Sequence, residues 1–323
     1  MSSREESVQG TFEMQVCVSS WNEIHAMRFL VALNILLSVS SSLGNTIILV
    51  ALKKETTLHA PSKLLYICLV STDLCVGFLL QPLNVVHLIS AMQGYQELCS
   101  RILVAIYLVG VVLFGISLST LTGISVDRLL ALLLKLRYRQ VVTLKRSRLA
   151  VTFMWLLNIF VATMYFGVHF IFLWYGYILI PVCFAITTFS YTKIYATLRR
   201  HQTSAGNRAF HSRQSGGELH LNITRYRKTL SAALWVQLTL VACFLPYAVV
   251  TALMGSYGLS PSIILAGRAA STLVYLNSTL NPFLYCWKIR EVRQAVKGTV
   301  RQLCFSSRVQ ASADNTSTME STC

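Results

Sequence analysis

Charged side chains are scarce in this sequence. Only 12% of its 323 residues are charged, and 12 acidic residues stand against 28 Lys and Arg. A soluble domain usually carries about 25% charged residues, whereas 54% of this chain is hydrophobic. This composition argues against a soluble enzyme and, despite a net charge of +16, against a partner that is a nucleic acid. It predicts a polytopic membrane protein whose positive charges lie at the membrane edges.

Long stretches without charge indicate how often the chain crosses the membrane, because each helical crossing needs about 20 apolar residues. The 44 residues between Arg148 and Lys193 suffice for two spans joined by a very short loop. Five other stretches predict one span each: those between Arg28 and Lys53, Lys63 and Glu97 (interrupted only by Asp73), Arg101 and Asp127, Lys228 and Arg268, and Arg268 and Lys288. The predicted fold is therefore all-α, a bundle of seven transmembrane helices.

The distribution of basic residues predicts the orientation. When the segments between spans are assigned to alternate sides, 24 of the 28 Lys and Arg fall on the side that holds the C-terminus. Basic residues are retained in the cytoplasm, so we expect the N-terminus outside and the C-terminus inside. The predicted parts are an extracellular N-terminus (1–23) with no cleaved signal peptide, the bundle (24–287), an amphipathic helix on the inner leaflet (288–303) and a cytoplasmic tail (304–323).

The nine cysteines do not form a disulfide framework, because most of them fall inside predicted spans. Cys17 and Cys99 are the two that lie on the oxidising face, so a disulfide between them is a candidate. Cys304, near the end of the amphipathic segment, is a candidate for palmitoylation, with a free thiol as the alternative.

Several patterns that would indicate another function are missing. No Lys lies between Lys228 and Lys288, which excludes a retinal Schiff base in the last span. Neither Gly-x-Ser-x-Gly nor His-Glu-x-x-His occurs, so we expect no enzyme and no catalytic residues. A secondary transporter remains as the alternative, although it should show inverted repeats and more mid-span charge than one acid. Uptake into vesicles would favour it.

Polar residues at mid-depth are the strongest functional signal within the spans, because such groups are costly in lipid. Asp73 is the one acid deep inside a span. It must be protonated, face water, or hold a cation together with nearby oxygen atoms. The alternative is a purely structural hydrogen-bond knot between helices. The polar residues at similar depth are Asn45, Ser117, Asn277, Ser278 and Asn281.

Ordered motifs, about one in each span, together carry a resemblance. They are Gly44-Asn45, Leu69-x-x-x-Asp73, Asp127-Arg128, Trp155, Tyr191-x-x-Ile194, Phe244-x-Pro246 and Asn281-Pro282-x-x-Tyr285. From about Ile24 to Val300 the chain resembles a rhodopsin-like (class A) G-protein-coupled receptor. The resemblance implies a plasma-membrane receptor in contact with membrane lipid, an extracellular small-molecule, lipid or peptide ligand, and a heterotrimeric G protein as partner. Arrestin is a further candidate partner.

Some positions depart from the family pattern. Leu129 replaces the Tyr of the Asp-Arg-Tyr motif, and Phe244 stands where most members have Trp. The second extracellular loop is almost absent, and no Cys occurs between residues 100 and 182 to bridge Cys99 in the usual way. These features are similar to the melanocortin branch and its adenosine- and lipid-receptor neighbours.

The resemblance assigns roles to the polar residues. It implies an allosteric sodium site at Asp73, Ser117, Asn277, Ser278 and Asn281, with Asn45 beside it, and no other cofactor. It implies an activation switch and G-protein contact formed by Asp127, Arg128, Leu136, Tyr191, Pro246, Asn281, Pro282 and Tyr285. Tyr226 stands where many relatives place an acid that holds Arg128, so we predict a weak latch and measurable basal signalling.

The predicted ligand pocket combines residues of three spans. They are Tyr107, Gly110, Val111 and Phe114, then Phe244, Tyr247 and Thr251, then Arg268, Ser271 and Tyr275. Gly110 stands where amine receptors carry Asp, and Thr251 stands where adenosine receptors carry Asn, so an amine or a nucleoside is disfavoured. An apolar pocket with Arg268 at its rim predicts an acidic lipid or a peptide with a carboxylate. The alternative is that the aromatic side chains only pack the bundle.

Overall fold

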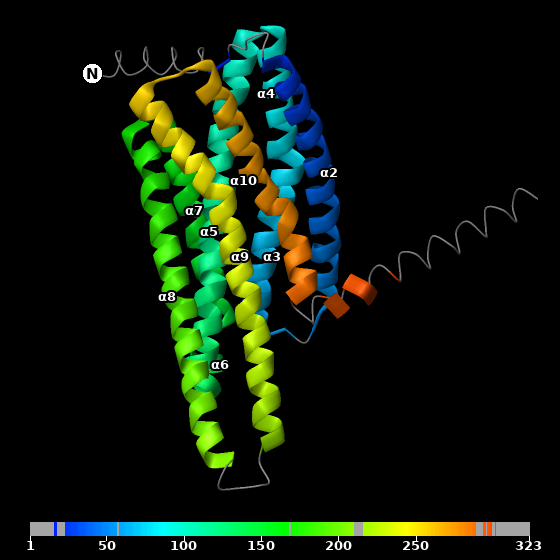
Figure 1. Cartoon of the computed structure of the whole chain (residues 1–323), viewed down its shortest axis with the longest axis vertical. Helices are drawn as coiled ribbons and strands as arrows, with labels where there is room; N and C mark the ends of the chain where they lie inside the picture. Colours follow the sequence, from blue (N-terminus) through cyan, green and yellow to red (C-terminus); the bar gives the residue numbers. More distant parts are fainter. Residues whose placement is uncertain are drawn as a thin grey trace, which may run out of the picture.

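The computed structural model describes residues 16–17, 23–56, 58–167, 169–209, 216–288, 293–294, 296–298 and 301. Their elements are α2 (Ile24–Lys54), α3 (Ala60–Cys75), the π-helix η2 (Val76–Leu80), α4 (Gln81–Gln93), α5 (Gln96–Leu134), the 3₁₀-helix η3 (Lys135–Arg137), α6 (Tyr138–Val141), α7 (Leu144–Gly167), α8 (His169–Ala209), α9 (Gly216–Tyr257) and α10 (Pro261–Lys288). Because η2 and α4 continue α3, the described residues form seven long helical rods, as the sequence predicts (Figure 1).

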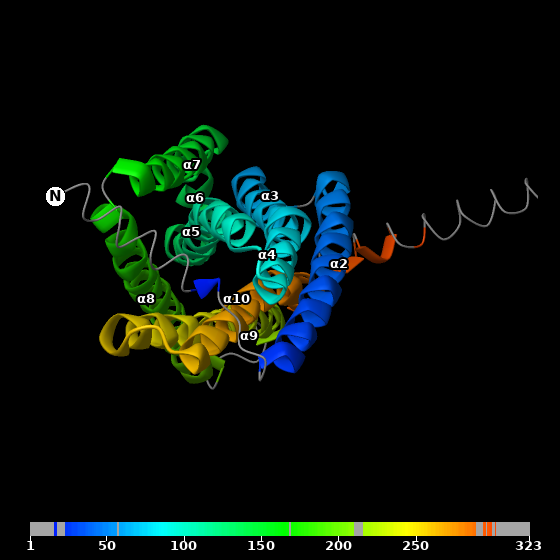
Figure 2. The same ribbon diagram turned by 90° about the horizontal axis from the view of Figure 1, so that it is seen from above.

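The rods are arranged around α5. It packs against α3 and α4 on one side and against α7 and α8 on the other, while α10 packs against α9 and α2 and completes the bundle (Figure 2). The two ends of the bundle are named here by residues of α5 and η3. The Cys99 end carries the turn between α4 and α5, and the Lys135 end carries η3 and α6.

The break between the fourth and fifth rods lies where the sequence predicts a minimal loop. α7 ends at Gly167 and α8 begins at His169, so the 44-residue stretch without charge holds two helices with almost nothing between them. No room remains for a second loop that folds back over the Cys99 end. Any cover over this end must therefore come from another part of the chain.

Six helical rods are long and apolar enough to cross a membrane, and α10 is not among them. The reason is visible in its buried side chains, since Arg268, Thr272, Asn277, Ser278 and Asn281 are all polar and at most 6% exposed. These side chains point at neighbouring helices, so they lower the mean hydropathy of α10 without facing lipid. Among the described residues, the helix that looks least like a membrane span therefore carries more buried polar side chains than any other helix.

The lack of a side chain at Gly44 allows α2 to pack closely against α10. A β-carbon on Gly44 of α2 would lie 3.1 Å from Cγ of Pro282 in α10. Pro282 lies inside α10 and Pro246 lies inside α9, so both helices continue through their prolines. Packing of α2 directly on the proline ring places Asn45 beside the polar part of α10.

Of the three glycines in α5, Gly115 is the most tightly packed. A β-carbon there would overlap Oδ1 of Asn158 in α7 and lie 2.8 Å from its Cγ. Asn158 is buried and held in place, because its Nδ2 donates to the Met154 carbonyl (2.7 Å) and its Oδ1 accepts from the Tyr175 hydroxyl (2.9 Å). The glycine is therefore required by a hydrogen-bonded neighbour.

We predict that Gly115→Ala lowers the thermal stability of the detergent-solubilised protein, since overpacking of this kind costs about 1–3 kcal/mol. Adding Asn158→Ala should restore most of the loss by removing the overlapping amide. Gly123→Ala is the matched control, because its β-carbon would meet only Leu65 and Met154 side chains at 3.7 Å or more. Thermal unfolding of the four proteins measures the effect, and an unchanged midpoint for Gly115→Ala would contradict the packing.

Beyond α10, residues 293–294, 296–298 and 301 are helical. Val296 packs against a buried cluster at the Lys135 end that includes Ile48, Leu52 and Leu65. These residues lie within the segment expected to form the amphipathic helix. Cys304, the candidate palmitoylation site, lies outside the described residues.

Candidate functional site

Asp73 lies at the centre of a polar cluster that joins three rods. Its side chain is fully buried on α3, and its Oδ2 accepts a hydrogen bond of 2.7 Å from Nδ2 of Asn281 on α10. Asn45 on α2 donates to the Ser278 carbonyl of α10 (3.2 Å) and to the Ser41 carbonyl (2.9 Å). The structure therefore brings Asp73, Asn281, Ser278 and Asn45 together as predicted.

This cluster, called the carboxylate cluster below, contains more oxygen acceptors than donors. Four buried oxygens have no hydrogen-bond partner within the described part of the chain: Oδ1 of Asp73, Asn45, Asn277 and Asn281. Leaving such groups unpartnered is expensive, and carboxylate and amide oxygens are the ligands that hard cations prefer. These residues fit a small cation. Ser117, the remaining predicted ligand, is buried on α5.

Phe114, Phe244 and Tyr275 form an aromatic group between α5, α9 and α10. The Phe114 ring meets Phe244 edge-on at 5.9 Å between centroids and stacks on Tyr275 at 6.0 Å. Tyr275 is buried, and Phe114 and Phe244 are partly exposed. The predicted aromatic residues of the ligand pocket thus meet in space, although mutual contact also satisfies the packing interpretation.

The other predicted pocket residues present few free polar groups. The Thr251 hydroxyl donates to the Tyr247 carbonyl (2.8 Å), and the Ser271 hydroxyl donates to the Gly267 carbonyl (2.9 Å). Gly110 is buried, Val111 and Tyr247 are half-buried, and Tyr107 packs near Leu103 and Ile264. The hydroxyls of Thr251 and Ser271 are therefore bonded within their own helices.

Arg268, predicted as the cation at the rim of the pocket, is buried. The residue is only 6% exposed, and it donates from Nη2 to the Val16 carbonyl (2.8 Å) and from Nη1 to Sδ of Met27 (3.1 Å). The contact with Val16 joins residues 252 positions apart. Sequence reasoning could not foresee this contact, because it depends on where the N-terminal segment folds back.

The two cysteines of the candidate disulfide meet in the structure. Cys17 and Cys99 are bonded, with 5.9 Å between their Cα atoms. His87 Nδ1 lies 3.3 Å from Sγ of Cys99, and the two sulfurs and this histidine are grouped closely enough to suggest a metal site. Both sulfurs are already used in the disulfide, so only the imidazole would remain to bind a metal. The group is a covalent anchor for the N-terminal segment.

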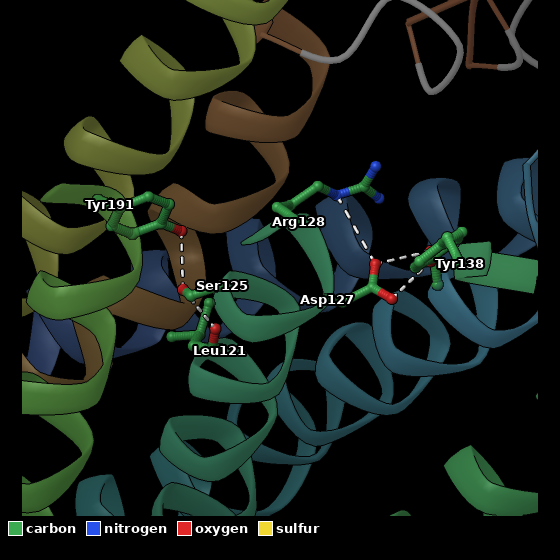
Figure 3. A network of polar contacts seen from close by, with 7 residues as sticks. Leu121, Ser125, Asp127, Arg128, Tyr138 and Tyr191 are labelled. Carbon is green, nitrogen blue, oxygen red and sulfur yellow. Dashed lines mark hydrogen bonds and ion pairs between the residues drawn. The ribbon is translucent and has the colours of Figure 1, made fainter. Parts of the chain in front are cut away.

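At the Lys135 end, Asp127 is held by more partners than the sequence indicates (Figure 3). Its Oδ1 accepts from the Tyr138 hydroxyl (2.7 Å) and its Oδ2 accepts from the Ser62 hydroxyl (2.8 Å). Arg128 is a distant ion partner, with its Nε 3.9 Å from Oδ2 of Asp127 and its guanidinium carbon 5.7 Å from the centroid of the Tyr66 ring. We call Ser62, Asp127, Arg128 and Tyr138 the latch.

The rest of the predicted switch is only partly described. Ser125 donates to the Tyr191 hydroxyl (2.8 Å), which ties α8 to α5 two residues before Asp127 (Figure 3). Leu136 on η3 is 95% exposed. The side chains of Tyr285 and Tyr226 lie outside the described residues.

Sequence reasoning missed two groups of residues. Ser62 and Tyr138 are the closest partners of Asp127, yet they belong to α3 and α6 and carry no motif of their own. Asn34, Gln81 and Asn84 are buried amides in the outer half of the bundle. The amides could have been found, since every amide inside a predicted span is a functional candidate.

Comparisons with known proteins agree with this architecture. A sequence model of the family described as "7 transmembrane receptor (rhodopsin family)" matches residues 44–170 and 166–285. The chain is 25% identical over 293 residues to "Adenosine receptor A3" of Canis lupus familiaris, which covers 82% of this chain and 88% of that protein. It is 25% identical over 300 residues to the protein of that name from Ovis aries, which covers 82% of this chain and 87% of the relative.

Proposed function

This chain belongs to the rhodopsin family of seven-transmembrane receptors, and on that premise we propose that it converts binding of an extracellular ligand at the Cys99 end into activation of a heterotrimeric G protein at the Lys135 end. It is a multi-pass G-protein-coupled receptor of the plasma membrane, near the adenosine-receptor branch and not an enzyme. Arrestin is the further partner that we propose. The family match favours this role over a secondary transporter.

One observation carries the proposal: a single helix connects the two ends. α5 holds Phe114 of the aromatic group and Asp127 of the latch without interruption. At 1.5 Å per residue these two lie about 20 Å apart along the helix. A ligand that moves Phe114 therefore acts on the same rigid element that positions Asp127 and Arg128.

The proposed orientation places the Lys135 end in the cytoplasm. This end carries Lys135 and Arg137 in η3 and Lys53 and Lys54 in the last turn of α2, and basic residues favour the cytoplasmic side. The disulfide at the opposite end needs an oxidising environment, which supports placing Cys17 and Cys99 outside the cell.

The proposed ligand is a lipid or a peptide and not an amine. Because residue 110 is glycine, α5 presents no carboxylate at this position to pair with an ammonium group. A β-carbon on Gly110 would meet only the Phe114 ring, at 3.8 Å. The relatives are named as adenosine receptors. By the resemblance, however, Thr251 stands where those receptors carry Asn, and the Thr251 hydroxyl is already bonded within α9. Buried Arg268 supports an acidic ligand group.

We also propose that sodium binds at the carboxylate cluster and favours the resting packing of the bundle. Support comes from Asp73, Asn277, Asn281 and Asn45, which each leave one buried oxygen without a hydrogen-bond partner in the described part of the chain. A bound cation would satisfy these oxygens and hold α2, α3 and α10 together.

A screen of lipids and peptides against a promiscuous G-protein reporter tests the function. We expect a hit to raise the reporter signal in cells that express the parent receptor and not in cells that express Arg128→Ala. Arg101→Ala is the matched control, because this arginine is exposed at the other end of α5. Ligand uptake into vesicles without nucleotide exchange would overturn the receptor assignment in favour of transport.

A further inference from the structure

Residues Val16 and Cys17, called the strap, lie inside the ring of helices at the Cys99 end. In Figure 2 the short dark-blue piece sits between α5 and α10. The disulfide to Cys99 fixes the strap to α5, and the Val16 side chain is buried against Leu103 and Ile264. The strap therefore occupies the part of the bundle that the missing second loop would otherwise cover.

The strap is the hydrogen-bond partner of a buried cation. Nη2 of Arg268 donates to the Val16 carbonyl, Nη1 faces Sδ of Met27, and Nε has no partner. Both hydrogen-bond partners are neutral. The charge of Glu23 acts on Arg268 from a distance, but within the described residues no carboxylate forms a salt bridge with Arg268. A buried guanidinium without a directly bonded carboxylate is incompletely compensated, whereas a bonded carboxylate gives it short, charge-assisted and often bidentate bonds.

Further unpartnered donors lie on α4, which contributes to the packing next to Arg268. Leu265 of α10, three residues before Arg268, packs against a buried cluster that includes Leu88 of α4. Asn84 and Gln81 precede Leu88 by four and seven residues, so the three side chains share one face of α4. Nδ2 of Asn84 and both polar atoms of Gln81 are buried without a partner in the described part of the chain.

A third helix completes the group. Nδ2 of Asn34 on α2 donates to the Thr272 hydroxyl on α10 (2.9 Å), and that hydroxyl donates to the Arg268 carbonyl (3.0 Å). The Asn34 Oδ1 has no partner. We call Asn34, Gln81, Asn84, Arg268 and Thr272 the outer polar cluster. Its unpartnered donors are Nε of Arg268, Nδ2 of Asn84 and Nε2 of Gln81, which together suit an anionic group that accepts several hydrogen bonds.

We propose that the outer polar cluster is a subsite for the carboxylate of the ligand, and that the Val16 carbonyl of the strap occupies Arg268 until that carboxylate displaces it. The inference rests on the proposed function only in that the ligand enters at the Cys99 end. It adds two points: the recognised ligand group is a carboxylate, and the Val16 carbonyl of the strap competes with it for Arg268. An acidic lipid and the C-terminus of a peptide share this chemistry.

Labelling with phenylglyoxal, which modifies accessible arginines, tests both parts on the full receptor in nanodiscs. Site-resolved mass spectrometry follows Arg268, with exposed Arg101 as the internal reference. In the parent protein we expect slow labelling of Arg268. Cys17→Ser, or brief reduction of the folded parent with dithiothreitol, should raise it by at least about tenfold if the strap is in place more than nine-tenths of the time. No rise after either treatment would show that the strap is not the cover.

Protection after strap release then tests the anion site. Sodium propionate at high millimolar concentration should slow labelling of Arg268 and leave Arg101 unchanged, while propionamide should protect neither. Asn84→Leu with Gln81→Leu should weaken this protection several-fold. Equal protection by propionamide, or none by propionate, would overturn the subsite.

Two further arms distinguish the source of the carboxylate. Oleate is compared with methyl oleate, and an acetylated dipeptide acid with its carboxamide, and the acid that protects at lower concentration indicates a lipid or a peptide ligand. Nucleotide exchange on a G protein is measured in the same preparations. Protection of Arg268 by propionate without nucleotide exchange would contradict the proposed function and leave the subsite standing. Nucleotide exchange without protection of Arg268 would contradict the subsite and leave the proposed function standing.

Discussion

Replacing Asp73 with Asn should abolish the effect of sodium on both the stability and the basal signalling of this receptor. Asp73 is the one carboxylate of the carboxylate cluster, and its Oδ1 has no hydrogen-bond partner in the described part of the chain. An asparagine keeps the size and can still accept from Asn281, but it removes the charge that would attract the cation. The variant should therefore fold while losing the ion.

The size of the effect follows from linkage. When the sodium concentration is about ten times the dissociation constant, binding to the folded state adds roughly 1.4 kcal/mol. For the parent receptor this corresponds to a rise of a few degrees in the unfolding midpoint, measured in sodium chloride against N-methylglucamine chloride. Basal nucleotide exchange should fall in sodium. Both responses should disappear in Asp73→Asn.

Asp127→Asn is the matched control, because it neutralises another buried carboxylate that lies at the Lys135 end and is bonded to Ser62 and Tyr138. It should keep the full sodium-dependent shift of the midpoint. If Asp73→Asn kept that shift as well, the carboxylate cluster would be a structural knot and not an ion site.

The sequence predicted the number of helices because charge is excluded from lipid wherever a helix crosses it. Even α10, which fails a test of hydropathy, was predicted from the 19 residues without charge between Arg268 and Lys288. The π-helix η2 was not predicted. Pro82, just after it, has no backbone N–H to donate within the helix, but this alone does not indicate which local helical geometry results.

The candidate site was predictable only where a residue type is unusual for its position. A single acid inside a membrane span is unusual, so Asp73 and its partner Asn281 were predicted. The structure shows them bonded to each other. Ser62 and Tyr138 are ordinary residues at their positions, and their role follows only from their contacts with Asp127. Likewise the distance from Val16 to Arg268 depends on the path of the whole N-terminal segment. Periodicity identifies a buried face, but it does not say what that face will meet.

Polar contacts join the same three rods at several depths, which links the outer polar cluster to the carboxylate cluster. Asn34, Ser38, Ser41 and Asn45 recur along α2 at spacings of three and four residues, so they lie on one face. Asn34 bonds to α10, Ser38 to the Gly77 carbonyl (2.6 Å), and Ser41 to the Asp73 carbonyl (3.2 Å). A ligand group that rearranges Arg268 therefore acts on a face that continues to the proposed sodium site.

The largest rise in basal signalling is expected from changes that free Arg128. Tyr138→Phe removes the shorter of the two hydrogen bonds to Asp127, and a hydrogen bond to a charged group is worth about 1.5–3 kcal/mol. If the latch stabilises the resting state, losing even half of this free energy raises the population of the active state up to about tenfold. The Arg128 ion pair is already long at 3.9 Å. We therefore expect the hydrogen bonds from Tyr138 and Ser62 to contribute more to the latch than this ion pair.

Nucleotide exchange on a purified G protein without ligand measures this effect. Exchange should rise in Tyr138→Phe, rise further when Ser62→Ala is added, and vanish when Arg128→Ala is combined with either. Tyr175→Phe is the matched control, because it also removes one phenol hydroxyl bonded to a neighbouring helix but leaves both hydrogen bonds to Asp127 in place. Parent-level exchange in the Tyr138→Phe, Ser62→Ala double variant would mean that these bonds stabilise both states equally, and the resting state would then have to be held elsewhere in the bundle.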